Sequence, residues 1–117
     1  MPAEIVAPRV PPFIINVDNA GRITVEPHGG HGRFRQTTVL QWSGNGQFTL
    51  RFFTFDSGKM TPAWPFVGDP QIGLNGARTP FERALAPVAA GQVAPAYTYS
   101  ISGDGSSTLD PIIGVDN

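Results

Sequence analysis

Apolar and polar residues alternate in several short stretches of the chain, a pattern typical of strands that bury one face. In the first stretch, Phe13, Ile15 and Val17 fall on the same face. Residues 18–21 follow with strong turn chemistry, Asp-Asn-Ala-Gly, and alternation resumes over 22–25. We therefore predict that these residues form a β-hairpin.

A second alternating stretch covers residues 36–42, and turn-forming residues 43–46 separate it from a third stretch over 47–55. This arrangement predicts another β-hairpin. The apolar phase of the third stretch changes near its end, at Phe53 and Phe55. Such a change indicates either a β-bulge or a strand end that is buried on both faces. Both interpretations place this strand in the centre of a sheet.

The middle of the chain has a weaker pattern, with one candidate edge strand at 64–67. Further on, Thr79, Pro80 and Glu82 match the start of a helix, with a Thr cap, Pro at the first helical position and Glu three residues after the cap. The pattern predicts a short helical segment near residues 80–86.

Two more strands are predicted near the C-terminus. Residues 96–102 alternate strictly, with Tyr97, Tyr99 and Ile101 on the inner face, and a last strand is expected around 112–115. Short strands separated by frequent turn signals are typical of sandwiches and barrels. We therefore expect an all-β fold, a Greek-key β-sandwich.

Proline is concentrated at the N-terminus, where Pro2, Pro8, Pro11 and Pro12 occur. Each proline removes a backbone donor and favours extended geometry in the residue before it. We predict an extended arm over residues 1–12, which can lie on the domain edge or reach a neighbouring subunit. The remainder, residues 13–117, is expected to form a single domain, because the chain length is close to the commonest domain size.

Charge and composition narrow the classes of partner. Only 15% of the residues are charged and the net charge is −1, so nucleic acid and anionic membrane surfaces are not expected as partners. This low fraction of charged residues suggests that a protein partner or a second copy of the chain covers part of the surface. Cysteine is absent, which excludes disulfides and thiolate sites. No signal region or membrane span is visible, which predicts a cytoplasmic protein if the chain is complete.

Several strand-core segments follow one another in an order that resembles the cupredoxin-like β-sandwich family. They are Val39-Leu40-Gln41-Trp42, Phe48-Thr49-Leu50-Arg51-Phe52, Pro65-Phe66, Tyr97-Thr98-Tyr99-Ser100-Ile101 and Leu109-Asp110-Pro111-Ile112-Ile113. The resemblance covers roughly residues 13–117 and implies the fold.

The resemblance does not carry over the metal chemistry of that family. Its copper is held by two His, one Cys and a weak axial Met. The positions that resemble the cysteine and the histidine after it are Ile101 and Asp104, and the stretch after Trp42 has no histidine. The resemblance therefore implies a member without copper, as in small bacterial proteins of this kind, and no cofactor is expected.

Both histidines lie in a glycine-rich loop. Glu26, His28 and His31 can supply one carboxylate and two imidazoles to a divalent metal ion. Two His and one Glu form an incomplete ligand set, however, and the alternative is that all three are exposed polar loop residues.

Exposed aromatic side chains form a second candidate binding site. Trp64 and Phe66 lie in a loop-like stretch and can bind a sugar ring or a protein partner. Trp42 alternates with core positions and is expected to be buried. Arg33, Arg35 and Arg51 can form a small basic patch, although surface ion pairs are the more common role of such residues.

No catalytic residues are predicted. The serines in 102–107 have no histidine close in sequence, and Asp104, Asp110 and Asp116 are more simply turn formers. We expect a non-catalytic structural or protein-interaction module. The alternatives are a divalent-metal-binding domain that uses the His28 and His31 loop, and a carbohydrate-binding module that uses Trp64.

Overall fold

The computed structural model describes residues 10–56, 58–88, 96–103 and 111–116. These residues form ten strands and one short 3-10 helix, η1 (His28–Gly30). The strands are β1 (Phe13–Val17), β2 (Ile23–Glu26), β3 (Gly32–Arg35), β4 (Val39–Gly44), β5 (Thr49–Asp56), β6 (Lys59–Pro62), β7 (Gly76–Arg78), β8 (Phe81–Ala84), β9 (Ala96–Ser102) and β10 (Ile112–Asp116).

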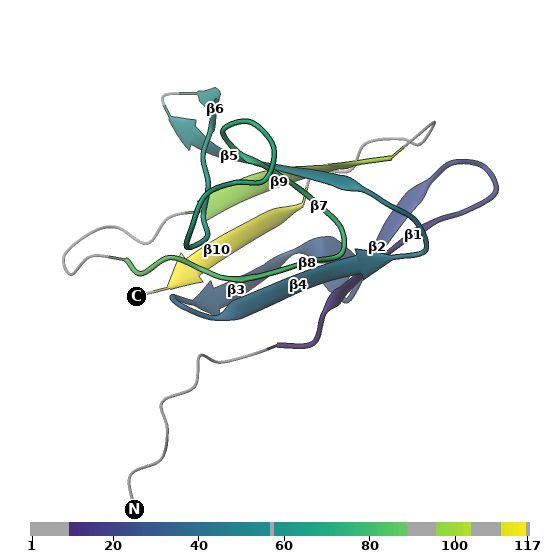
Figure 1. The fold of residues 1–117 in the computed structure, drawn as a ribbon, viewed down its shortest axis with the longest axis horizontal. Coiled ribbons are helices and arrows are strands. Elements are labelled where there is room, and N and C mark those ends of the chain that lie inside the picture. Colours follow the sequence, from purple (N-terminus) through teal and green to yellow (C-terminus); the bar gives the residue numbers. More distant parts are fainter. Residues whose placement is uncertain (1–9, 57, 89–95, 104–110, 117) are drawn as a thin grey trace, which may run out of the picture.

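The strands make two mixed sheets that pack face to face in a sandwich-like fold. The small sheet has the order β2-β1-β4-β8, and the large sheet has the order β3-β10-β9-β5-β6, with β7 also paired to β5. Two neighbouring pairs are parallel, β1 with β4 and β3 with β10. In Figure 1, β5 and β9 lie in the upper layer and β4 and β8 in the lower.

The core between the sheets is built around Trp42, which is fully buried as its alternation predicts. Its ring centroid lies within about 6 Å of five other aromatic rings: Phe13 at 5.3 Å, Tyr99 at 5.4 Å, Phe52 at 5.7 Å, Phe66 at 5.8 Å and Phe81 at 6.1 Å. Because these rings come from both sheets and from the segment before β8, Trp42 joins the two layers.

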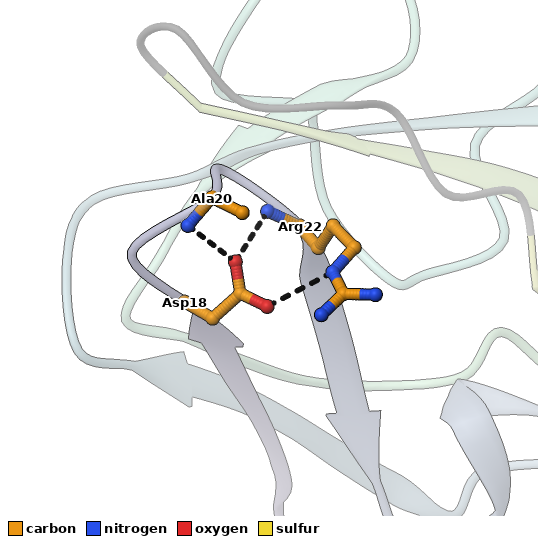
Figure 2. A network of polar contacts seen from close by, with 3 residues as sticks. All are labelled: Asp18, Ala20 and Arg22. Carbon is orange, nitrogen blue, oxygen red and sulfur yellow. Dashed lines mark hydrogen bonds and ion pairs between the residues drawn. The ribbon is translucent and has the colours of Figure 1, made fainter.

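The first predicted hairpin is confirmed. β1 pairs with β2 in antiparallel register, and Phe13 and Ile15 are buried. The carboxylate of Asp18 closes the turn, as Figure 2 shows, by accepting hydrogen bonds from the backbone N–H groups of Ala20 and Arg22, each at 2.9 Å. It also accepts one from Nε of Arg22 at 3.0 Å. These bonds explain why Asp starts the turn.

The second predicted hairpin is wrong. β4 pairs with β1 and β8 in the small sheet, whereas β5 pairs with β9, β6 and β7 in the large sheet. Residues 43–46 therefore cross from one layer to the other. Asn45 holds this crossing to β1, because its backbone N–H donates to Ile15 O and its side-chain amide exchanges two hydrogen bonds with the backbone of Val17.

The predicted helical segment near residues 80–86 is also wrong, because Phe81–Ala84 form strand β8. The hydroxyl of Thr79, which was expected to cap a helix, accepts a hydrogen bond from the backbone N–H of Phe48 at 2.9 Å instead. Pairing with β4 also buries Phe81 and leads into the buried Leu85. Tertiary pairing thus overrides the local capping pattern.

Strand β5 is central in its sheet, as expected, but its register is continuous through Phe53 and no bulge interrupts it. The change of phase has a different cause. Phe52 faces the core, whereas Phe53 is partly buried and Phe55 is 64% exposed on the opposite face.

The remaining predictions have mixed outcomes. Strands β9 and β10 are confirmed at the expected positions, with Tyr99 and Ile101 fully buried. The candidate edge strand at 64–67 is reduced to a single bridge between Phe66 and Leu85. Most of the predicted arm, residues 1–9, lies outside the described residues. Among the residues described, no helix is long and apolar enough to cross a membrane.

Candidate functional site

The glycine-rich loop between β2 and β3 is tied to the core. The phenolic O–H of Tyr99 donates to the carbonyl oxygen of Gly30 at 2.6 Å. Two backbone bonds, Gly30 N–H to Pro27 O and His31 N–H to His28 O, close the turn itself. These bonds close the turn of the loop and attach it to strand β9.

His31 is held in a way that opposes metal binding. Its Nδ1 accepts a hydrogen bond from the backbone N–H of Ile112 at 3.0 Å. Because a backbone amide can only donate, Nδ1 has no proton and the neutral imidazole carries its proton on Nε2. A metal ion on Nε2 would move that proton to Nδ1 and break the bond to Ile112. A metal ion on Nδ1 would displace it directly.

The structure does not gather the three predicted metal ligands. Glu26 and His28 are exposed, and in the described part of the chain no three His, Asp or Glu side chains form a group able to hold a metal ion. Metal binding by Glu26, His28 and His31 thus stays a hypothesis without geometric support.

Trp64 is partly buried and packs as a core residue. Its ring contacts Phe52, Phe66 and Phe81 at centroid distances of 5.8, 5.2 and 5.7 Å. The guanidinium of Arg83 lies 5.7 Å from the ring centroid, and the indole N–H donates to Gly68 O at 2.9 Å. These contacts favour a structural role over a platform for a sugar ring.

Phe66 is only 3% exposed, so the expectation that it lies on the surface is wrong. The segment around it lies along the end of β8, where Val67 N–H donates to Ala84 O and Ala86 N–H donates to Pro65 O. The prolines in this segment obscured the short pairing in the sequence, because they interrupt the alternation that identifies a strand.

The three arginines of the predicted basic patch are not together. Arg33 and Arg35 lie on β3, whereas Arg51 lies on β5, three strands and about 14 Å away. Arg33 is paired with Asp116, and the hydrogen bond between them lowers the pKa of the Asp116 carboxyl and raises that of the Arg33 guanidinium.

The outer face of the large sheet carries exposed apolar side chains. One register row joins Ile112, Thr98, Phe53 and Pro62 across four adjacent strands. In the next row Phe55 faces Met60. Exposure is 51% for Ile112, 64% for Phe55 and 48% for Met60. We call the residues Phe53, Phe55, Met60, Pro62 and Ile112 the outer patch.

The sequence contains a signal for the outer patch. The phase change at Phe53 and Phe55 predicts a bulge or burial on both faces. It instead marks apolar residues on the solvent face of a sheet, where polar residues are usual.

An open polar cleft of about 710 Å³ lies at one end of the sandwich, where the crossing from β4 to β5 meets the ends of β7 and β9. The polar residues Gln47, Thr49, Arg78 and Ser102 are among those that line it. The predicted turn formers Asp104 and Asp110 lie outside the described residues. Asp116 is not in a turn, because it lies at the end of strand β10 and pairs with Arg33.

Comparison of the sequence with models of known protein families gives no match, and comparison with curated protein sequences gives none either.

Proposed function

We propose that the chain is a non-catalytic interaction module that associates with a second copy of itself through the outer patch. The observation that carries this proposal is the alignment of apolar side chains from β10, β5 and β6 on one sheet face, with Thr98 of β9 between Ile112 and Phe53. An apolar surface of this kind, at the margin of a domain with few charges, is typical of an interaction site.

The face is a better contact surface than the sheet edge beside it. The edge strand β6 contains Pro62, which has no N–H to donate, and Lys59, whose charge opposes the addition of a strand. The end of the other sheet's edge strand, β8, is covered by the segment that bonds to Ala84 and Ala86. Side-chain packing on the outer patch avoids both obstacles.

A two-fold contact suits the distribution of charge around the outer patch. Such a contact places the same apolar residues of both copies against each other. Arg33 lies across Gly114 at the margin and is neutralised by Asp116. Arg51 lies two residues before Phe53 on β5 and can stay at the solvated rim of the contact.

The resemblance to the cupredoxin-like family enters this proposal only as a statement about fold. The position that resembles the family's cysteine ligand is Ile101, a fully buried hydrocarbon side chain opposite Leu50. This observation supports a sandwich that uses the position for packing and leaves function to its surface.

Sedimentation velocity across micromolar concentrations tests the proposal. We expect the wild-type chain to show a concentration-dependent dimer. The double variant Phe55→Lys, Met60→Lys should weaken dimerisation at least about tenfold, since it places charges in the desolvated contact. Leu74→Lys is the matched control, because Leu74 is 78% exposed and lies outside the outer patch.

Two outcomes would contradict the proposal. A wild-type chain that stays monomeric over the whole range would exclude self-association and leave the outer patch to another protein. Equal dimerisation by wild type and the double variant would show that a different surface makes the contact.

A further inference from the structure

The polar cleft at the end of the sandwich has the size of a small-molecule site. Its volume of about 710 Å³ falls within the range of about 300–1,000 Å³ that is usual for ligand pockets. Phe48 is its aromatic residue and is only 3% exposed, so the cleft offers no open ring face for stacking. Its chemistry is therefore that of polar groups.

Strand register places three of these polar groups in a row. Thr49 on β5 is the register partner of Arg78 on β7 and of Ser102 on β9. Their chain neighbours Leu50, Ala77 and Ile101 are fully buried, so alternation directs these three side chains away from the core. Adjacent strands are about 4.8 Å apart, which places two hydroxyls and one guanidinium within reach of a single small ligand.

The positive charge of Arg78 is not neutralised within the described structure. Its backbone N–H donates to Gln71, but its guanidinium makes no ion pair or hydrogen bond with a described residue. Arg22, in the turn after β1, is by contrast paired with Asp18. No Asp or Glu is among the described residues that line the cleft, and Arg78 carries the only charge among those residues.

The crossing from β4 to β5 adds backbone donors to the same cleft. The side-chain amide of Asn45 is engaged with the backbone of Val17, which holds this crossing in place. The backbone N–H groups of Gly46 and Gln47 make no hydrogen bond within the part of the chain described. Two successive amides that have no partner among the described residues, next to an arginine, are an arrangement suited to binding an anion.

We propose that this cleft binds a small molecule that carries a carboxylate or phosphate group beside several hydroxyls, such as a sugar acid or a sugar phosphate. Arg78 pairs with the anionic group, and the amides of Gly46 and Gln47 donate to its oxygens. Ser102 and Thr49 exchange hydrogen bonds with the hydroxyls of the ligand. This site is separate from the outer patch, and the proposal does not depend on self-association.

NMR titration of the ¹⁵N-labelled chain tests this at constant ionic strength with four probes: glucuronate, glucose 6-phosphate, inorganic phosphate and glucose. We expect saturable shifts confined to the amides of Gly46, Gln47 and Ser102 and to Nε of Arg78. At least one of the two charged sugars should bind more tightly than inorganic phosphate, and glucose should give no saturable shift. The two charged sugars distinguish a carboxylate from a phosphate ligand.

Arg78→Gln should weaken binding of the charged sugars about tenfold or more, because it removes a charge-assisted hydrogen bond. Arg35→Gln, on the distant strand β3, is the matched control and should bind like wild type. Arg78 is exposed, so the dispersed spectrum of a folded chain should persist in both variants.

Three results would overturn the proposal. They are the absence of localised shifts with both charged sugars at millimolar concentration, equal affinity in wild type and Arg78→Gln, and equal affinity for inorganic phosphate and the charged sugars. The last result would remove the role assigned to the hydroxyls.

Discussion

The hydroxyl of Tyr99 donates a hydrogen bond to the carbonyl oxygen of Gly30 at 2.6 Å, across 69 residues of sequence. The hydroxyl oxygen of Tyr99 also accepts a hydrogen bond from the indole N–H of Trp42 at 3.2 Å. Tyr99 is fully buried and this burial raises the pKa of its phenol, so the hydroxyl remains a donor at neutral pH. One side chain therefore links the glycine-rich loop, the large sheet and the small sheet.

Tyr99→Phe should destabilise the protein by about 2–4 kcal/mol, because it leaves the Gly30 carbonyl and the Trp42 N–H buried without partners. Urea unfolding should show a lower midpoint with an unchanged slope. Tyr97→Phe is the control, since Tyr97 is only partly buried and its hydroxyl makes no hydrogen bond with a described residue. If both variants unfold at the same midpoint, the link through Tyr99 contributes nothing to stability.

Gly30→Ala and Gly29→Ala separate backbone strain from steric conflict in the loop. Both glycines have positive φ, +85° and +63° respectively, so alanine is strained at either position. At Gly30 an added Cβ would also lie 2.6 Å from the Tyr99 hydroxyl and 2.9 Å from the Pro111 ring, whereas at Gly29 the nearest contact is 3.6 Å.

We expect Gly29→Ala to lower the unfolding free energy by about 1 kcal/mol and Gly30→Ala by at least about 2 kcal/mol. Thermal or urea unfolding of the two variants measures the difference. Equal losses would show that the core accommodates the added methyl group.

Asp18 should contribute stability that is lost in acid. The pKa of its carboxyl is lowered, mainly by the hydrogen bond from the Arg22 backbone N–H and further by those from Ala20 N–H and the Arg22 side chain. The unfolded chain therefore takes up this proton at a higher pH than the folded chain does. The contribution is present above about pH 4 and disappears as the pH falls further.

Urea midpoints measured from pH 6 down to about pH 2.5 test this prediction. Asp18→Asn should show a smaller acid loss than wild type. Asp69→Asn should follow wild type, since the Asp69 carboxylate makes no hydrogen bond or ion pair with a described residue. An Asp18→Asn profile parallel to that of wild type would contradict the prediction.

His31 should be the Nε2–H tautomer when its ring is neutral, because its Nδ1 accepts the bond from Ile112. Imidazole ¹⁵N chemical shifts distinguish the two nitrogens.

Isothermal titration with zinc, copper and nickel should give the same weak heats for wild type and for the double variant His28→Ala, His31→Ala. Stoichiometric binding by wild type alone would restore the metal-binding hypothesis.

The sequence by itself determined strands β1, β2, β4, β5, β9 and β10 and the side of each that is buried, whereas β3, β6 and β7 were not predicted and β8 was predicted as a helix. Phe13, Ile15, Tyr99 and Ile101 are buried as their alternation predicts, because a period of two assigns side chains to faces whatever the neighbouring strand is. The turn at Asp18 was equally predictable, since its hydrogen bonds reach no further than four residues.

Tertiary structure alone decided which strands are neighbours. Residues 43–46 have a composition compatible with a hairpin or with a crossing, and the bonds of Asn45 to β1, distant in sequence, select the crossing. Likewise Thr79 matches a helix cap locally, but Phe48 uses its hydroxyl.

The candidate sites depended on tertiary structure for the same reason. The outer patch and the cleft include residues brought into register from strands that are distant in sequence, such as Phe53 with Thr98 and Thr49 with Arg78. Alternation gives each residue a face but contains no information on its cross-strand partner. That partner is selected by the packing of the whole core.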